Sequence, residues 1–291
     1  MQYKLVPFEE IDKNKWNGTV HYAPHGNVFG YYWYLRSVMK EWDAIIEGDY
    51  QAVMPIPRYQ LSPFEWSLIS QLGPYSVNAI TSSRCRSFFE LWQQSTSKQY
   101  YPFNHAWSVH LNQCSKGSLQ QNSHISLHLS NDYDTLYDLY SGASQSILSE
   151  LIETDFSYQS FNKPEQFLEN EKISNEERST LYRLYYNATQ RGAGYHTRLT
   201  NKATGQMADC FVISDQRHLY ISYLKSSNDA DTQLKLIDTL VKSFMGRPLS
   251  LQVPEKIAPL WKIENLDKND YLYLPHQEIS FLGRLRALLK V

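Results

Sequence analysis

The sequence has few of the features that mark redox, secreted and membrane proteins. Its three cysteines, Cys85, Cys114 and Cys210, are widely spaced and form no CxxC pair, which favours reduced, packed thiols in a reducing compartment. No run approaches the roughly 18 apolar residues of a membrane span, and the first ten residues contain no signal-peptide core. We therefore expect a cytoplasmic protein without a membrane span.

A large charge of one sign is also missing. The formal net charge is −2 at pH 7, which argues against bulk nucleic acid as a partner and leaves room only for local basic patches. The sequence shows no metal-ligand spacing, no G-x-S-x-G elbow, no P-loop and no dinucleotide fingerprint. No metal site is predicted, and the enzyme classes that carry these motifs are set aside.

Aromatic residues, by contrast, are abundant: 22 tyrosines, 12 phenylalanines and 7 tryptophans. A hydrophobic content of 42% with 20% charged residues is typical of a folded globular protein, and 291 residues are enough for two separate cores. Tyrosine suits half-buried strand faces and pocket walls, because its body is apolar and its tip polar. Packing accounts for most of these side chains, and the excess is weakly in favour of a binding cleft.

The same order of elements is predicted twice along the chain. The second half has three strands, at 195–202, 206–214 and 218–226. A helix follows, whose apolar residues recur at helical spacing, and then a strand at 249–253. The first half is predicted to repeat this order with strands at 42–47, 50–58 and 67–72, a helix around 85–92, and a strand at 106–111. The repetition predicts an α+β fold of two units, 1–145 and 146–291.

Further elements are expected around these two units. Helices are predicted at 31–40, at 176–190 after a capping Ser174, and over a long stretch of 136–151 that joins the units. A polar loop is expected at 112–123 and a strand at 125–129. Two prolines near the end of the strand at 50–58 predict that this end is an edge or a bulge. The basic tail 282–291 is interpreted as a helix docked on its own protein, with a membrane-surface helix as the alternative.

This order of elements resembles the GNAT (acyl-CoA N-acyltransferase) fold. Two such units joined by a helix resemble the Fem-type peptidyltransferases, which add amino acids from aminoacyl-tRNA to peptidoglycan precursors. The local patterns that carry the resemblance are 42–46 (WDAII), 51–55 (QAVMP), 71–73 (QLG) and 191–195 (RGAGY) ahead of a glycine turn at 205. The resemblance implies tandem GNAT-like units, each with a mixed, mostly antiparallel sheet flanked by helices.

The sequence departs from the resemblance at the coenzyme A loop. GNAT enzymes read Q/R-x-x-G-x-G/A there, and the backbone N–H groups of the loop hold a pyrophosphate. Segment 225–233 (KSSNDADTQ) has no glycine and carries Asp229 and Asp231, while 71–79 (QLGPYSVNA) has one glycine and a proline. No cofactor is therefore predicted, which favours the Fem branch. The linking segment 141–148 (SGASQSIL) also lacks the basic residues common in that family, which weakens tRNA as a partner.

Candidate site residues in the first half follow from the resemblance, because the fourth and fifth strands of a GNAT unit splay apart and open a cleft. Gln71 and His110 are expected beside it, with His110 as a base or, alternatively, a hydrogen-bonded structural histidine. Trp33 and Arg36 lie at i, i+3 of the first expected helix and are candidates for binding a carboxylate. The alternative places Trp33 in the core and Arg36 in solvent.

Candidates in the second half are Arg191, Tyr195 and His196, which flank the glycine-bearing turn at 192–194 and are predicted to form an anion pocket. Arg191 is equally expected to interact with the C-terminal dipole of its helix. Asp209 occupies an otherwise apolar strand face, so its pKa is expected to be raised unless the carboxylate is paired. A general base and a structurally paired acid are both consistent with this position.

Three functions remain open from the sequence. The first is a Fem-like transfer of an acyl or aminoacyl group to an amine, with strand-edge N–H groups as oxyanion donors and aminoacyl-tRNA as a possible donor. The second is a non-catalytic binding protein on a diverged GNAT scaffold that holds a small or peptide-like ligand in the cleft. The third is a structural protein whose aromatic surface forms a homodimer. The sequence specifies neither donor, acceptor nor oligomeric state.

Overall fold

The computed structural model describes residues 2–95, 100–114, 119–161, 163–168, 173–226 and 229–274. The chain divides into two compact units, neither of which is one continuous stretch of sequence. The described part of the first unit lies within 2–26, 41–122 and 271–274, and that of the second within 27–40 and 123–270. The division expected near residue 145 falls inside the second unit, because residues 123–145 group with the C-terminal half, as does segment 27–40.

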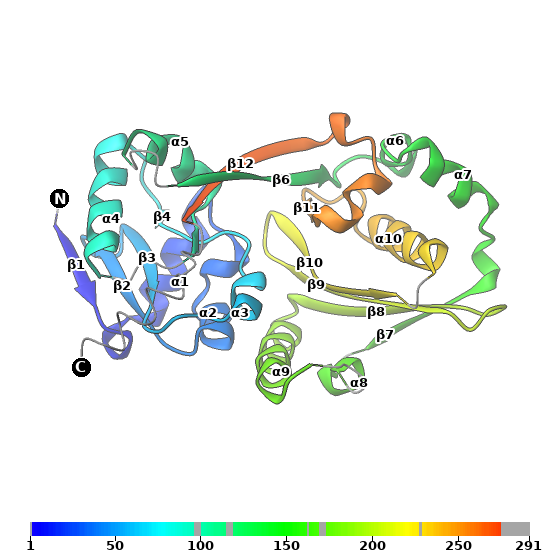
Figure 1. Ribbon diagram of the computed structural model, residues 1–291, viewed down its shortest axis with the longest axis horizontal. Coiled ribbons are helices and arrows are strands. Elements are labelled where there is room, and N and C mark those ends of the chain that lie inside the picture. Colours follow the sequence, from blue (N-terminus) through cyan, green and yellow to red (C-terminus); the bar gives the residue numbers. More distant parts are fainter. Residues whose placement is uncertain are drawn as a thin grey trace, which may run out of the picture. The chain divides into compact units, whose positions relative to one another are not determined.

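The first unit is built on a small antiparallel sheet in the order β1-β2-β3-β4 (Figure 1). Its described elements are β1 (Tyr3–Val6), η1 (Phe8–Glu10), α1 (Lys13–Tyr22), β2 (Trp42–Glu47), β3 (Ala52–Pro57), α3 (Pro63–Ser67), β4 (Tyr75–Ser76), α4 (Ser82–Ser95), β5 (Tyr101–Pro102) and α5 (His105–Cys114).

The two prolines of β3 sit where the prediction put them, at a sheet edge. Pro55 and Pro57 pair with β2, opposite Ala44 and Trp42, whereas the described pairing of β3 with β4 stops at Val53. A proline has no N–H to donate, so the absence of a partner strand on that side leaves no ladder hydrogen bond unmade. The expected strands at 42–47 and 50–58 and the helix around 85–92 are confirmed as β2, β3 and α4.

Two predicted strands of the first unit were wrong. Segment 67–72 starts with the last residue of the short helix α3, which has a capping box between Ser62 and Glu65. Its Leu72 makes only an isolated bridge. Segment 106–111 belongs to helix α5, where Trp107 and Leu111 at i, i+4 are buried and the Asn104 Oδ1 accepts from the Trp107 N–H at 3.2 Å. The helical spacing of these two apolar residues prevailed over the apparent strand alternation.

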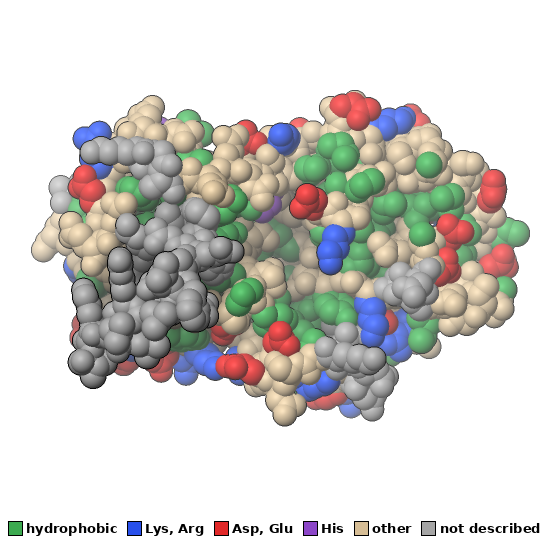
Figure 2. Space-filling view, viewed as in Figure 1, with side chains coloured by type: hydrophobic (Ala, Val, Ile, Leu, Met, Phe, Trp, Pro, Cys, Tyr) green, Lys and Arg blue, Asp and Glu red, His purple; other side chains and the backbone are tan. Residues whose placement is uncertain are grey.

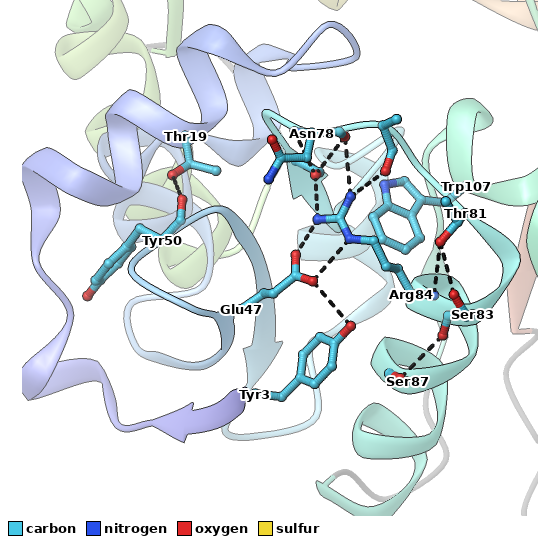
Figure 3. Close-up of polar contacts among 12 residues, drawn as sticks. Tyr3, Thr19, Glu47, Tyr50, Asn78, Thr81, Ser83, Arg84, Ser87 and Trp107 are labelled. Carbon is cyan, nitrogen blue, oxygen red and sulfur yellow. Dashed lines mark hydrogen bonds and ion pairs between the residues drawn. The ribbon is translucent and has the colours of Figure 1, made fainter. Parts of the chain in front are cut away.

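A buried ion pair ties the sheet of the first unit to α4 (Figure 3). Arg84 and Glu47 have side chains that are 5% and 1% exposed, and the guanidinium donates to both carboxylate oxygens, from Nε to Oε1 at 3.0 Å. The remaining guanidinium donors reach the Ser76 hydroxyl at 2.8 Å and the Asn78 carbonyl at 3.3 Å. Tyr3 donates to Glu47 Oε1 at 3.2 Å. Every charged atom of the pair therefore has a polar partner, as a buried pair requires.

The second unit is built on a mixed sheet in the order β12-β6-β11-β10-β9-β8-β7. The β10–β11 pair is parallel, and β6–β11, β9–β10, β8–β9 and β7–β8 are antiparallel. Strands β6 (Gln120–His128) and β12 (Asp267–Leu274) each continue into the first unit. Its other described elements are η2 (Val28–Gly30), α2 (Tyr32–Val38), α6 (Tyr133–Asp138), α7 (Gly142–Glu150), η3 (Glu153–Asp155), β7 (Phe156–Phe161), α8 (Pro164–Leu168), α9 (Asn175–Gln190), β8 (Gly194–Asn201), β9 (Met207–Ser214), β10 (His218–Ser226), α10 (Ala230–Phe244), β11 (Ser250–Val253), η4 (Glu255–Leu260) and η5 (Ile263–Asn265).

Helices cover both faces of the second sheet, with α10 on one side of β8 and β9 and α9 on the other (Figure 1). The α10 face holds the main core, to which Leu199, Cys210 and Val212 contribute. On the α9 face the Tyr185 ring stacks on Phe211 with ring centroids 3.8 Å apart. The strands expected at 195–202, 206–214, 218–226 and 249–253 and the helices expected from the same region are confirmed.

Segment 27–40 joins the second unit through named contacts. The Asp215 carboxylate accepts from the Val28 N–H at 2.9 Å, and Asn187 of α9 donates to the Ser37 hydroxyl of α2 at 3.1 Å. The long helix expected over 136–151 is two helices, α6 and α7, because Tyr140 between them bridges to Trp261 and Ser141 caps α7. Strand β6 begins at Gln120, inside the loop expected at 112–123. The tail 282–291 lies outside the described residues.

Candidate functional site

The candidate site lies on the α9 face of strands β7, β8 and β9. Arg198 of β8 is the register partner of Asp209 of β9, and His196 is the partner of Phe211, so all four side chains share one face. The neighbouring residues Thr197 and Leu199 point to the opposite face, towards α10. Alternation along two strands thus places a cation, an imidazole and a carboxylate together on one side of the sheet.

Asp209 is held by His196 and Arg198 through a single oxygen. Its Oδ1 lies 3.0 Å from His196 Nε2 and 2.9 Å from Arg198 Nε. The side chains of His196 and Asp209 are 3% and 11% exposed, and that of Arg198 is 26% exposed. No described residue donates a hydrogen bond to the other oxygen, Oδ2. We define these three residues as the Asp209 cluster.

Phe161 of β7 closes one side of the Asp209 cluster. Its ring stacks on His196 with centroids 4.8 Å apart and planes 26° apart, and the Arg198 guanidinium carbon lies 5.2 Å from its centroid. The stack fixes the imidazole plane, and the cation–π contact adds to the hold on Arg198. His196 is therefore shielded from solvent, and its role is to position Asp209. The atom that can still accept a hydrogen bond from a ligand is Asp209 Oδ2.

The pKa of Asp209 is lowered. Burial alone raises it, but the hydrogen bonds from His196 and Arg198, together with their charges, outweigh that effect. The sequence interpretation held that this pKa would be raised unless the carboxylate were paired, and pairing is what the structure shows. A carboxylate with a lowered pKa remains ionised at neutral pH, so Asp209 is better suited to holding a cation than to removing a proton.

The lowered pKa gives a pH-dependent contribution to stability. Because the pKa is depressed in the folded state, Asp209 stabilises the second unit above its unfolded pKa of about 3.9, and this contribution is lost as pH falls through the folded pKa. We expect the difference in free energy of unfolding between wild type and Asp209→Asn to shrink across that window, as measured by urea unfolding at a series of pH values. Asp134→Asn, which changes an exposed acid of α6, serves as the control. A difference that stayed constant down to pH 2 would contradict the assigned pairing.

Strand β10 runs beside the Asp209 cluster and extends past its described pairing with β11. Its pairing with β11 covers only His218 to Tyr220, although β10 extends to Ser226. A register shift between Ile221 and Tyr223 makes Ser222 a bulge, after which Lys225 stands opposite Asp209. The fourth and fifth strands of a GNAT unit were expected to splay apart in this way. Residues 221–226 thus lie beyond the described β10–β11 register.

The residues at the start of α10 do not fit a coenzyme A pyrophosphate. Asp229 is the N-cap, and its carboxylate accepts from the Asp231 N–H at 3.2 Å and from the Thr232 hydroxyl. A negative charge already occupies the end of the helix where an anion would bind. No step of a reaction is therefore assigned to this cofactor.

The remaining candidates of the second unit are only partly brought together. The Arg191 guanidinium carbon lies 5.4 Å from the Trp33 ring centroid, and its Nη1 donates to the Asn187 carbonyl in the last turn of α9 at 3.2 Å. Arg36 donates to the carbonyl of Lys40 beyond the end of its own helix. Tyr195 donates to the Gly192 carbonyl at 2.8 Å and points away from His196, since the two are adjacent along a strand. Arg191, Tyr195 and His196 thus line no common pocket.

Gln71 and His110 lie in the first unit and not on splayed strands. Gln71 accepts from the His105 N–H at 3.4 Å, at the start of α5. His110 is on the second turn of α5 and contacts the Ser82 hydroxyl through Nδ1 at 3.2 Å. Ser82 in turn donates to Gln113 at 3.0 Å. Because the single hydroxyl proton goes to Gln113, His110 donates to Ser82 and does not act on it as a base.

Arg198, Phe161 and Ser222 were missed in the sequence. His196 and Arg198 are two apart in a strand, so their common face was readable from the alternation. Their partner across β9 and the stack on Phe161 required the strand register. The bulge at Ser222 has no sequence signal such as a glycine. Among the described residues there is no group of three His, Cys, Asp or Glu side chains that could hold a metal ion. No described helix is long and apolar enough to cross a bilayer.

Comparison with known proteins gives likenesses in structure and none in sequence. No protein-family model and no curated protein match the chain. The crystal structure of FemX superposes with a TM-score of 0.58 at 10% identity, covering 99% of each chain. A conserved protein of unknown function from Bacteroides thetaiotaomicron superposes with a TM-score of 0.56 at 12% identity, covering 92% of this chain and 99% of the other.

These likenesses extend over nearly the whole of this chain and the whole of the two solved structures, so both units are matched together. At such low identity they establish the fold and nothing about the reaction. The α+β class, with sheets flanked by helices, is as the sequence predicted. The chain has the FemX-like fold of tandem GNAT-like units.

Proposed function

We propose that the protein is a Fem-like acyl- or aminoacyltransferase that acts on an amine, and that Asp209 binds the ammonium group of the acceptor. The observation that carries the proposal is the uncommitted Oδ2 of a carboxylate whose Oδ1 is fixed by His196 and Arg198. When one oxygen of an ionised carboxylate is already fixed, the other oxygen is pre-organised to accept a hydrogen bond from a primary ammonium group.

The acceptor amine, after losing its proton to solvent, attacks the carbonyl carbon of an ester donor, and the bond from that carbon to the leaving oxygen breaks. Donors for the developing oxyanion are proposed among the backbone N–H groups of residues 221–226, the part of β10 that follows its described pairing with β11. Asp209 positions the amine, and no residue is assigned as the general base.

The surface bears on the choice of donor. In the view of Figure 2, the described Lys and Arg side chains occur in small groups among acidic ones and form no continuous basic surface. A long nucleic acid would need several phosphate contacts. Aminoacyl-tRNA is therefore only one of the donors to be tested. For the acceptor we propose a small or peptide-like molecule, and for the protein the cytoplasmic location expected from the sequence.

The test is a thermal-shift panel followed by a transfer assay. Coenzyme A, acetyl-CoA, aminoacyl-tRNA and an amine-bearing peptidoglycan precursor peptide are each added to the purified chain. A ligand at a hundred times its Kd stabilises the folded state by about 2.7 kcal/mol. We expect a shift with the peptide or the aminoacyl-tRNA, and transfer of the aminoacyl group to the peptide detected by mass spectrometry.

Asp209→Asn should reduce the transfer rate roughly 10- to 100-fold, the effect of losing one hydrogen bond to a charged group, while Asp134→Asn leaves the rate unchanged. Transfer by Asp209→Asn at the wild-type rate would refute the assigned role, and a shift with coenzyme A would indicate an ordinary acetyltransferase.

A non-catalytic binding protein remains the second candidate, because the lowered pKa of Asp209 makes this carboxylate a poor base. The same panel separates the two functions. A binding protein shows a thermal shift with the amine-bearing peptide that Asp209→Asn abolishes, and no donor in the panel yields a transfer product.

A further inference from the structure

A serine, a histidine and an aspartate on three neighbouring strands of the second sheet form a connected row. Ser250 of β11 is the register partner of His128 of β6, and its Oγ lies 2.7 Å from His128 Nδ1. The Nε2 of the same ring lies 2.5 Å from Asp267 Oδ2, at the start of β12. We call these three residues the Ser250 row. It is separate from the Asp209 cluster, which lies on β8 and β9.

The order of atoms in the Ser250 row sets the direction of proton transfer. His128 Nε2 faces a carboxylate, which only accepts hydrogen bonds, so this contact favours the tautomer that carries the ring proton on Nε2. In the neutral ring the lone pair is then on Nδ1, where it accepts from the Ser250 hydroxyl. This is the arrangement that turns a serine into a nucleophile: a base on the hydroxyl, and a carboxylate that holds the base in the correct tautomer.

Backbone contacts hold the row in place. His128 and Ser250 are directly paired in an antiparallel ladder, and the Ser250 N–H donates to the Arg217 carbonyl at 2.8 Å. Leu127 and Leu251, the next residues on the two strands, are buried in the core on the opposite face. The His128 and Asp267 side chains are 58% and 57% exposed, so a small reagent in solution reaches the row.

We propose that Ser250 is a second nucleophile, with His128 as its base and Asp267 as a positioning residue, and that it accepts an acyl group from activated carboxylic esters. The Ser250 oxygen attacks the ester carbonyl carbon, its proton passes to His128 Nδ1, and the bond to the alcohol oxygen breaks so that the alcohol leaves with that proton. Water then cleaves the acyl-serine, which releases the carboxylic acid and restores the hydroxyl. This activity goes beyond amine acylation and does not depend on Asp209.

The chain contains its own control for this proposal. Ser82 also contacts a histidine, His110 Nδ1, at 3.2 Å, but its hydroxyl donates to Gln113 and no described carboxylate is bonded to that ring. A serine whose hydroxyl donates its hydrogen bond to an amide oxygen is not activated by the histidine beside it. Ser82 is therefore expected to stay unmodified under conditions that acylate Ser250.

The experiment treats the full chain with 4-nitrophenyl acetate and maps acetylated residues by peptide mass spectrometry, with release of nitrophenolate followed by absorbance. We expect acetyl-Ser250 in the wild type and none in Ser250→Ala. His128→Asn should slow acetylation at this site roughly 100-fold, the typical contribution of a general base. Asp267→Asn should slow it, and Asp267→Glu should restore part of the rate, which a merely structural tie would not do. Melting temperatures of all four variants check that the fold is kept.

Two results would overturn the proposal. One is acetylation of Ser82 at the same rate as Ser250, which would show general serine reactivity. The other is an acetylation rate at Ser250 that does not change in His128→Asn. Asp134→Asn, which changes an exposed acid of α6 outside both sites, is expected to leave the acetylation rate at Ser250 unchanged. Because the Ser250 row shares no residue with the Asp209 cluster, this test and that of the transferase proposal fail independently.

Discussion

Replacing Arg84 with Met should destabilise the first unit by about 3–5 kcal/mol, because it leaves the Glu47 carboxylate buried without its cation. Glu47 is 1% exposed and receives guanidinium donors on both oxygens. The measurement is urea unfolding combined with hydrogen exchange. Loss of protection is expected in β2, β3 and α4, with α9 and β8 to β10 unchanged.

Two control variants make this prediction specific. The double variant Glu47→Leu, Arg84→Met should be more stable than Arg84→Met alone, since it removes the unpaired charge as well. Lys15→Ala breaks an ion pair with Asp49 whose side chains are 48% and 75% exposed, and it should leave the unfolding midpoint close to that of the wild type. A double variant no more stable than the single one would show that the pair does not account for the loss.

Replacing Leu35 with Ala should destabilise the second unit, although Leu35 lies early in the sequence. Its side chain is 0% exposed on α2, the helix that packs with α9. Truncation of a buried leucine costs about 2–5 kcal/mol. Hydrogen exchange should show reduced protection in α9 and β8 to β10, with β2 and β3 unaffected.

Leu5→Ala is the matched control, since the same change is made on β1 at a side chain that is 56% exposed. It should have little effect on either unit. Reduced protection in β2 and β3 after Leu35→Ala would instead assign α2 to the first unit and contradict the division of the chain found in the structure.

The second half of the fold was largely predictable because its elements are specified locally. Ser174 caps α9 as expected, and it forms a capping box with Glu177. Strand β10 has the predicted bounds, His218–Ser226, since apolar and polar residues alternate between turn residues. The first half was less predictable after residue 60. Its strands there are short and give weak periodicity, and the sequence of α5 has a strand-like alternation at 106–111.

The candidate site was predictable only one residue at a time. Asp209 and His196 stood out in the sequence, as an acid on an apolar face and a histidine near a glycine turn. Their contact depends on the pairing of β8 with β9, and the uncommitted oxygen of Asp209 depends on the geometry of both donors. Gln71 and His110 were assigned by resemblance to strands that do not exist at those positions.

The sequence by itself determined the α+β class, the paired arrangement of units, the lack of a glycine loop for coenzyme A and the acid on β9. These depend on local periodicity, capping and residue type. Tertiary structure alone decided that residues 27–40 belong to the second unit, that Arg198 faces Asp209, and that Ser250 meets His128 from 122 residues away. Strand register and long-range packing place side chains next to one another, and the spacing of residues along a single segment specifies neither.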